Sequence, residues 1–94
     1  VELLRAFREA DAVLCTVTDR ITAECFTQPE RRARIVANFG VGVNHIDLDA
    51  ARAAGVAVTN TPGVLTDDTA DLAILLMLAV LRRASEGERE LRQG

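Results

Sequence analysis

Two glycines in the stretch Asn38–Asp47 are the residues of this chain best suited to binding a ligand. Gly40 and Gly42 follow the apolar run Ile35–Ala37, and a helical pattern begins near Leu48, so a strand is predicted to end in a glycine turn that leads into a helix. In an open parallel sheet, ligands bind beyond the carboxyl ends of the strands. Glycines there let the backbone approach a ligand and leave amide N–H groups free to face an anion. The turn is therefore a candidate site for a small carboxylate. The alternative is a tight turn that needs glycine only for its backbone angles.

The ionisable side chains of the chain are better explained by structural roles than by catalysis. His45 is the sole histidine, and a histidine at a helix entry, bonded near Asp47, is more common than a catalytic one. Asp67, Asp68 and Asp71 could suggest metal ligands or paired carboxylates. Their place at the start of a predicted helix instead favours interaction with the positive end of the helix dipole. We therefore assign no catalytic residue and no metal site in this chain.

The two cysteines do not form a recognisable reactive or metal-binding motif. Cys15 and Cys25 lie ten residues apart, with no CxxC pair and no second histidine. We expect one to be buried by a strand and the other by a helix. Nothing here indicates a secreted disulfide scaffold, so a reducing cytoplasm is the expected location.

Apolar runs and breaks predict an α/β fold in which strands and helices alternate. The pattern Leu3, Leu4, Phe7 indicates an amphipathic helix at the beginning of the chain. Because a strand, a helix and a strand follow one another closely around the glycine turn, parallel pairing with a right-handed crossover is expected. The predicted strands are Ala12–Cys15, Arg34–Phe39 and Val56–Thr59. The predicted helices between them are Ile21–Phe26, capped by Asp19 or Thr18, and Leu48–Ala54, capped by Asp47 and ended by Gly55.

A long helix is predicted after the turn Thr61–Gly63. Thr66 or Asp67 is expected to cap it. It is apolar on every face from Leu72 to Leu81, so another domain or another subunit is expected to bury it. Beyond Arg82 the helix is predicted to continue as a polar segment, weakened by Gly87.

Composition restricts the chain to one small domain or a piece of a larger one. It has 94 residues and a net charge of −3, so neither nucleic acid nor an anionic membrane is an expected partner. Its longest apolar run, Leu72–Leu81, is far shorter than the roughly 20 residues that span a bilayer. The arginines at 31, 32 and 34 are expected to form a solvated surface. The first strand would lie at an unpaired sheet edge, and both ends of the sequence look cut, so we expect a missing N-terminal part.

Three blocks of sequence carry a family resemblance. The stretches Asn38–Asp47, Ala53–Gly63 and Val64–Ala73 resemble, in order and spacing, segments of the NAD(P)-dependent D-2-hydroxyacid dehydrogenases, with the glyoxylate and hydroxypyruvate reductase branch the most similar. The likeness covers about Arg34–Gly94. Asn44-His45 stands where many members have Asp-Asn, so the resemblance supports no finer inference about the substrate.

The resemblance implies part of a flavodoxin-like, three-layer substrate-binding domain: three parallel strands and a long C-terminal crossing helix. In this family the turn amides hold the substrate carboxylate, which maps onto Val41 and Gly42. The threonine that opens the crossing helix lies near the nicotinamide, which maps onto Thr69. The implied reaction is hydride transfer between NADH or NADPH and a small 2-oxo acid such as glyoxylate or hydroxypyruvate. The crossing helix, Leu72–Leu81, is implied to pack in a homodimer.

The same resemblance implies that this chain is inactive alone. The family's catalytic Arg, Glu and His, and its GxGxxG phosphate-binding motif, belong to a cofactor domain that follows the segment seen here; no such motif occurs in this chain. Two alternatives remain: a truncated or engineered half-domain that self-assembles, and a module that binds a 2-oxo acid without chemistry.

Overall fold

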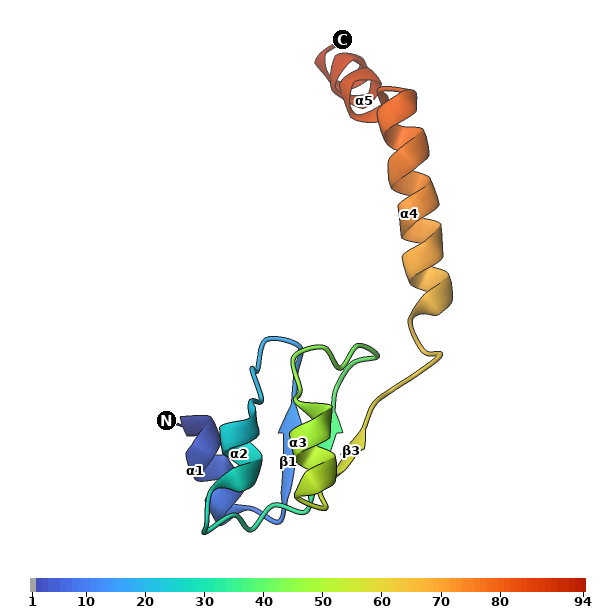
Figure 1. Cartoon of the computed structure of the whole chain (residues 1–94). Helices are drawn as coiled ribbons and strands as arrows, with labels where there is room; N and C mark the ends of the chain where they lie inside the picture. The colour runs from blue at the N-terminus through green and yellow to red at the C-terminus, as the bar shows by residue number, and fades with distance from the viewer. Residues whose placement is uncertain (1) are drawn as a thin grey trace. The chain divides into compact units, whose positions relative to one another are not determined.

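The computed structural model describes residues 2–94, which form two units, one ending at Pro62 and one spanning Gly63–Gly94 (Figure 1). Each unit is described by itself. The first contains α1 (Glu2–Glu9), β1 (Ala12–Cys15), α2 (Ala23–Thr27), β2 (Ile35–Asn38), α3 (Leu48–Ala53) and β3 (Ala57–Thr59). The second contains α4 (Thr66–Leu81) and α5 (Ala84–Gln93).

The sheet consists of three parallel strands in the order β1-β2-β3, as the sequence predicts. Val13 pairs with Val36, and Val36 pairs with Val58. The bounds of β1 agree with the prediction, whereas β2 and β3 are shorter than predicted: Arg34, Phe39 and Val56 lie outside them. β1 and β3 are the two edges of this sheet, and parallel pairing brings the carboxyl ends of all three strands to one side.

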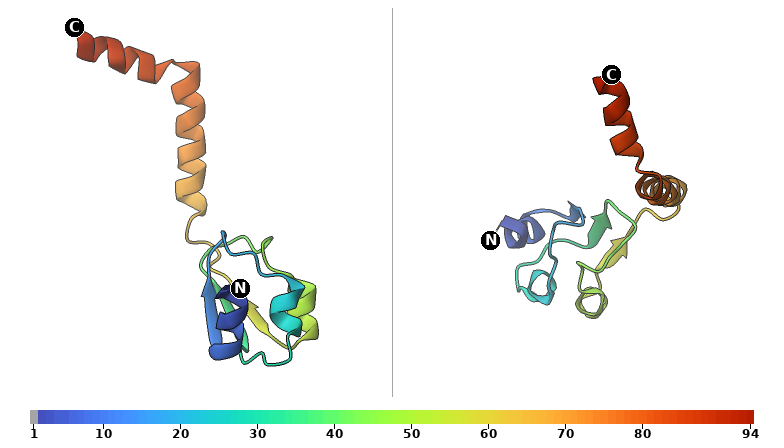
Figure 2. Two further views of the ribbon diagram at one scale, coloured as in Figure 1. Left: turned by 90° about the vertical axis from the view of Figure 1, so that its left-hand side faces the viewer. Right: turned by 90° about the horizontal axis from the view of Figure 1, so that it is seen from above.

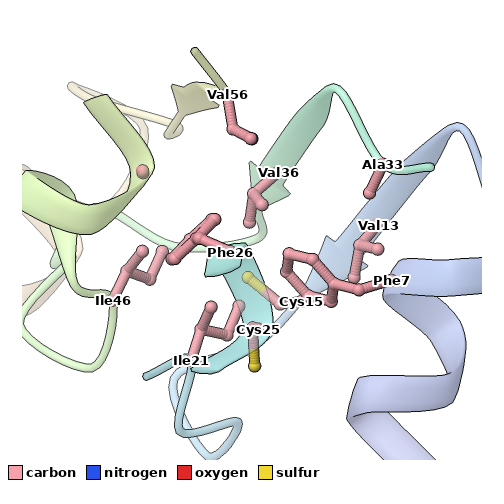
Figure 3. Packing of buried hydrophobic residues seen from close by; sticks show 11 residues of the cluster. Phe7, Val13, Cys15, Ile21, Cys25, Phe26, Ala33, Val36, Ile46 and Val56 are labelled. Atoms are coloured by element: carbon pink, nitrogen blue, oxygen red, sulfur yellow. The ribbon is translucent and has the colours of Figure 1, made fainter. Parts of the chain in front are cut away.

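The core lies between the sheet and the helices α2 and α3, which cover the same face (Figure 2, right). Inward side chains of β1 and β2 pack there against both helices, and Phe7 of α1 meets Phe26 of α2 edge to face, with ring centroids 5.5 Å apart. Figure 3 shows this cluster, whose members are mostly aliphatic. The buried residues are Phe7, Val13, Cys15, Ile21, Cys25, Phe26, Ala33, Val36, Ile46, Ala51 and Val56. Both cysteines are buried free thiols, as predicted, and burial raises the pKa of each.

The opposite face of the sheet carries exposed apolar side chains. Leu14 of β1 is 75% exposed, although it stands in mid-strand, and Ala12 and Ala57 on the same face are exposed as well. Helices α2 and α3 form a layer on the other face of this sheet. The third layer implied by the family resemblance stays a prediction.

The first cap predicted from sequence is wrong. α2 starts at Ala23 with Thr22 at the N-cap, not with Thr18 or Asp19. Asp19 instead accepts a hydrogen bond from the backbone N–H of Thr16 at 2.8 Å, so its carboxylate closes the loop after β1. Ile21 forms an isolated parallel bridge with Ile46, and this pairing keeps it out of the helix.

The predicted cap and end of α3 are confirmed. The side chain of Asp47 accepts a hydrogen bond from the N–H of Ala50 at 2.9 Å. Gly55 follows the helix with φ of 68°, the left-handed conformation in which glycine is favoured.

The second unit differs from the prediction at both ends of its long helix. α4 begins at Thr66, with Leu65 rather than Thr66 or Asp67 in the N-cap position. The chain then leaves the helix at Arg82–Arg83, where Arg83 has φ of 50°, and Gly87 lies inside the separate helix α5. Along α4, apolar side chains are exposed, with Leu75 at 60% and Met77 at 59%. Burial of this helix by a partner therefore stays a prediction. None of the helices in residues 2–94 has the length and apolar character needed to cross a membrane.

The arginine cluster is not wholly a solvated surface. Arg31 is half-buried, and its guanidinium donates to the carbonyls of Phe26 and Ala54, each at 3.0 Å, and to that of Ala33. It therefore joins the end of α2, the approach to β2 and the end of α3. Arg32 is exposed and forms a bidentate pair with Asp11.

Candidate carboxylate-binding turn

The candidate site is the turn that follows β2, at the carboxyl edge of the sheet. The backbone leaves β2 at Asn38 and passes through Phe39 and Gly40 to Val41 and Gly42. Phe39 still donates its N–H to the carbonyl of Cys15 at 2.8 Å, so the turn begins beside the end of β1. The structure thus places Val41 and Gly42 where the sequence predicts a ligand site, at the ends of neighbouring parallel strands.

The buried side chain of Asn38 is hydrogen-bonded to the turn. Its side chain is 2% exposed, and Nδ2 donates to the carbonyl of Gly40 at 3.0 Å and to that of Gly42 at 2.9 Å. Asn38 is not among the site residues predicted from the sequence. A signal was available: in a strand, Asn38 falls on the same face as Val36, so a polar side chain is directed into the core, where it requires partners.

Two residues that follow β3 also donate hydrogen bonds to the turn. Asn60 donates Nδ2 to the carbonyl of Val41 at 2.9 Å, and the N–H of Thr61 donates to the carbonyl of Gly40 at 3.1 Å. Three successive carbonyls, those of residues 40 to 42, are therefore each engaged by a donor from the protein.

The amide groups of the turn are left free. In residues 2–94 no protein acceptor is found for the N–H of Val41 or of Gly42, and no peptide bond there is cis. A trans peptide directs its N–H opposite to its C=O. Because the carbonyls of Gly40 and Val41 are drawn toward Thr61 and the two asparagines, the N–H groups of Val41 and Gly42 point away from those donors. This arrangement suits an anion that accepts hydrogen bonds from the backbone.

The packing and backbone angles of the turn explain a glycine at position 40 but not at position 42. At Gly40, a Cβ would lie 3.3 Å from Cγ1 of Val17 and 3.5 Å from Nδ2 of Asn38, and φ is 158°. Gly40 therefore allows a close approach of the chain within the protein. Gly42 is not among the residues with positive φ, and a Cβ there would meet nothing within 4 Å. The alternative explanation, unusual backbone angles, thus does not account for Gly42.

His45 is bonded to a different partner from the one predicted. Its Nε2 lies 2.9 Å from Oδ1 of Asn38, whereas Asp47 uses its carboxylate to cap α3. The two β-bridge residues Ile21 and Ile46 and their neighbours line a shallow hollow of about 230 Å³ beside His45. Val41 and Gly42 do not line this hollow. His45 therefore has a structural partner beneath the turn.

Thr69 lies in the first part of α4, in the second unit. Its Oγ1 donates to the carbonyl of Leu65 at 2.6 Å, a bond within the helix. Asp67 and Asp68 lie in the first turn of α4, as expected for residues that interact with the helix dipole, whereas Asp71 lies beyond that turn. Contact of Thr69 with a cofactor stays a prediction. In the part of the chain from residue 2 onward, no group of three His, Cys, Asp or Glu side chains could hold a metal ion.

Comparison with known proteins identifies the family. Residues 1–90 match the family described as D-isomer specific 2-hydroxyacid dehydrogenase, catalytic domain. The chain belongs to this family. The family resemblance carried by the glycine turn and the two following blocks is therefore confirmed, and it extends to the N-terminal side of Arg34.

Individual relatives agree with this assignment. The chain is 46% identical over 92 residues to a glyoxylate reductase of Pyrococcus horikoshii, a match that covers 98% of this chain and 27% of the relative. A solved structure from Thermus thermophilus is 47% identical with a TM-score of 0.86, covering 99% of this chain and 30% of that one. A 3-phosphoglycerate dehydrogenase of Entamoeba histolytica with bound NAD⁺ is 28% identical with a TM-score of 0.70, covering 83% and 25%. The chain spans about a quarter to a third of the length of these relatives.

Proposed function

We propose that this chain supplies the carboxylate-binding part of a glyoxylate-reductase-like D-2-hydroxyacid dehydrogenase. The proposed substrate is a small 2-oxo acid such as glyoxylate or hydroxypyruvate, reduced reversibly to the 2-hydroxy acid. One observation carries the proposal: Val41 and Gly42 present free N–H groups on a turn whose carbonyls are tied to Asn38, Asn60 and Thr61. Hydrogen bonds from these amides would fix the carboxylate and thereby orient the adjacent C2 carbonyl.

The proposed cofactor is NAD or NADP, which supplies the hydride when bound. We propose that the dinucleotide is bound mainly outside this chain, since the sequence has no GxGxxG motif. The hydroxyl of Thr69 donates its proton to the carbonyl of Leu65. The lone pairs of Thr69 Oγ1 remain available, so we retain it as a contact near the nicotinamide. The cofactor domain and the groups that polarise the carbonyl and donate the proton are proposed to lie outside these 94 residues.

Two enzyme assays test the proposal. The protein from the complete reading frame is expected to oxidise NADH or NADPH when glyoxylate or hydroxypyruvate is added, as followed by nicotinamide absorbance. The 94-residue chain alone is expected to show no turnover above a blank, because neither a cofactor fold nor an acid–base group is assigned to it. Turnover by the isolated chain, or none by the complete protein, would contradict the proposal.

A module that binds a 2-oxo acid without chemistry is the second candidate, favoured by the same free amides. Calorimetric titration of the complete protein with oxalate, a non-reducible dicarboxylate, measures this binding directly. Binding without nicotinamide oxidation would favour the module over the enzyme.

The exposed apolar surface of α4 supports a homodimer in which this helix is buried. Leu76 is 56% exposed, and a dimer interface would remove it and its neighbours from water. The variant Leu76→Glu is expected to shift the sedimentation of the protein toward the monomer. The matched variant Leu91→Glu, which adds the same charge on α5, is expected to leave it unchanged. A wild-type protein that sediments as a monomer at all concentrations would exclude both the dimer and the self-assembling half-domain.

We propose a cytoplasmic location, because the two buried free thiols, Cys15 and Cys25, suit a reducing compartment.

A further inference from the structure

The carboxamide of Asn38 uses its full hydrogen-bonding capacity. Its two N–H protons go to the carbonyls of Gly40 and Gly42. Its Oδ1 lies 2.9 Å from Nε2 of His45 and 3.5 Å from Sγ of Cys15. A primary amide has two donors and two acceptor positions, so this buried side chain is satisfied in one orientation only. The reversed orientation would direct Oδ1 at two carbonyl oxygens and Nδ2 at the imidazole and the thiol.

This orientation determines the proton on His45. Since Nδ2 of Asn38 is committed to two carbonyls, Oδ1 can only accept, and Nε2 of His45 must therefore carry a proton. His45 thus acts as a donor that holds the carboxamide from the side opposite the turn. The thiol of Cys15 occupies the second acceptor position.

The bonds of Asn38 also determine how the turn presents its amides. The peptide joining Gly40 to Val41 has its carbonyl on Asn38, so the N–H of Val41 faces the other way. The second Asn38 bond holds the carbonyl of Gly42, whose peptide carries the N–H of Val43. The N–H of Gly42 belongs to the preceding peptide, whose carbonyl accepts from Asn60. The N–H of Thr61 also donates to the carbonyl of Gly40, so Asn38 and Thr61 together fix the direction of the Val41 N–H.

We propose that Asn38 is a positioning residue of the carboxylate site: it holds the turn through the carbonyls of Gly40 and Gly42 and so orients the N–H of Val41, while His45 and Cys15 keep its carboxamide in the required orientation. Asn38 touches no reacting atom. The inference rests on the proposed function, since the Val41 amide, whose peptide Asn38 holds, is one of the two assigned to the substrate carboxylate. The proposed site thus includes a buried side chain in addition to the backbone amides of Val41 and Gly42.

The first experiment tests the hydrogen bonds in the wild-type protein, without substrate. Hydrogen exchange followed by NMR is expected to show slow exchange of the two Asn38 side-chain amide protons. The exposed Asn44 is a matched control of the same residue type and is expected to exchange rapidly. The ¹⁵N spectrum of His45 is expected to show a protonated Nε2. Rapid exchange at Asn38, or an unprotonated Nε2, would overturn the proposal.

The second experiment measures glyoxylate kinetics in the complete protein. Asn38→Ala is expected to raise KM about tenfold, with kcat changed much less, because carboxylate binding is lost before chemistry is affected. Asn38→Ser retains one hydroxyl donor and is expected to recover part of the loss; it decides the question if the alanine variant does not fold. The control Gln28→Ala removes a half-buried amide that donates to two carbonyls, those of Leu4 and Cys25, away from the turn.

The outcomes separate this inference from the proposed function. Wild-type KM in the folded Asn38 variants, or an equal rise in KM for Gln28→Ala, would overturn the positioning role and leave the proposed substrate intact. A wild-type protein that neither binds oxalate nor reduces glyoxylate would refute the proposed function. In that case, altered NMR signals of the Val41 and Gly42 amides in Asn38→Ser, but not in Gln28→Ala, would still support the role of Asn38 in shaping the turn.

Discussion

Nε2 of His45 donates a hydrogen bond to Oδ1 of the buried Asn38 across 2.9 Å, seven residues back along the chain. This bond connects the start of the segment leading to α3 with the end of β2, and the glycine turn lies between the two residues. The only histidine of the chain is thus committed to supporting a turn, and this role explains its position without assigning it acid–base chemistry.

Replacing His45 tests that role. His45→Leu leaves Oδ1 of Asn38 with the weak Cys15 thiol donor alone, so we expect a loss of about 1–2 kcal/mol in the free energy of unfolding. His45→Gln can still donate and is expected to lose less, with kcat for glyoxylate close to wild type. Urea unfolding and steady-state kinetics check both variants. Abolished turnover in a stable His45→Gln protein would show that the histidine has a catalytic role.

Gly42→Ala separates ligand binding from folding. Nothing lies within 4 Å of a Cβ at Gly42, so we expect the free energy of unfolding to change by less than about 0.5 kcal/mol. A methyl group beside the free amides would crowd a bound carboxylate. KM for glyoxylate is therefore expected to rise roughly tenfold, which corresponds to the loss of one charge-assisted hydrogen bond.

Gly55→Ala is the matched control and should behave in the opposite way. With φ of 68°, Gly55 is in a conformation that costs an alanine about 1–2 kcal/mol, and it lies outside the turn. We expect a lower free energy of unfolding with KM unchanged. If both variants lose stability equally and keep wild-type KM, Gly42 is needed for the fold and not for a ligand.

Arg31→Lys tests whether the side chain of Arg31 stabilises the fold by joining the ends of α2 and α3 to the approach to β2. Three separate nitrogens of the Arg31 guanidinium donate to the carbonyls of Phe26, Ala33 and Ala54. The single ammonium nitrogen of lysine does not reproduce this spacing and would leave part of this half-buried set unpaired. We expect a loss of about 1–3 kcal/mol in unfolding free energy, as measured by urea denaturation. Arg34→Lys, at an exposed neighbouring position, should change it by less than about 0.5 kcal/mol. Equal effects of both changes would argue against the role given to Arg31.

The ion pair of Asp11 with Arg32 predicts a pH dependence. Hydrogen bonds from the Arg32 guanidinium lower the pKa of Asp11 below its ordinary value of about 3.8. The ionised pair therefore favours the folded state above that pH, and this contribution disappears as pH falls through the lowered pKa.

Urea midpoints of wild type and Asp11→Asn, compared from neutral to acidic pH, measure this contribution. We expect a small difference that favours the wild type at neutral pH, vanishes in acid and shrinks in high salt, since both groups are exposed. A difference that persists in acid would mean that the substitution acts through something other than the charge of Asp11.

Local patterns were sufficient for much of the fold. The apolar run of β1, the acidic cap of α3 at Asp47 and the left-handed glycine at Gly55 depend on residues within a few positions of one another, so the sequence predicts them correctly. Where two local interactions compete, local reasoning fails. Asp19 can cap a helix or close the loop after β1, and only the position of Thr16 in the folded chain decides for the loop.

The sequence by itself determined the parallel α/β pattern, the family, and the choice of the glycine turn with Val41 and Gly42 as the candidate site. The tertiary structure decided which side chains support that turn. Asn38 and Asn60 donate hydrogen bonds to its carbonyls, and His45 donates to Asn38. The physical reason is that these bonds join three segments whose proximity comes from strand pairing and packing. The sequence tells which groups can donate or accept a hydrogen bond. The partner of each group depends on which segments the fold brings together.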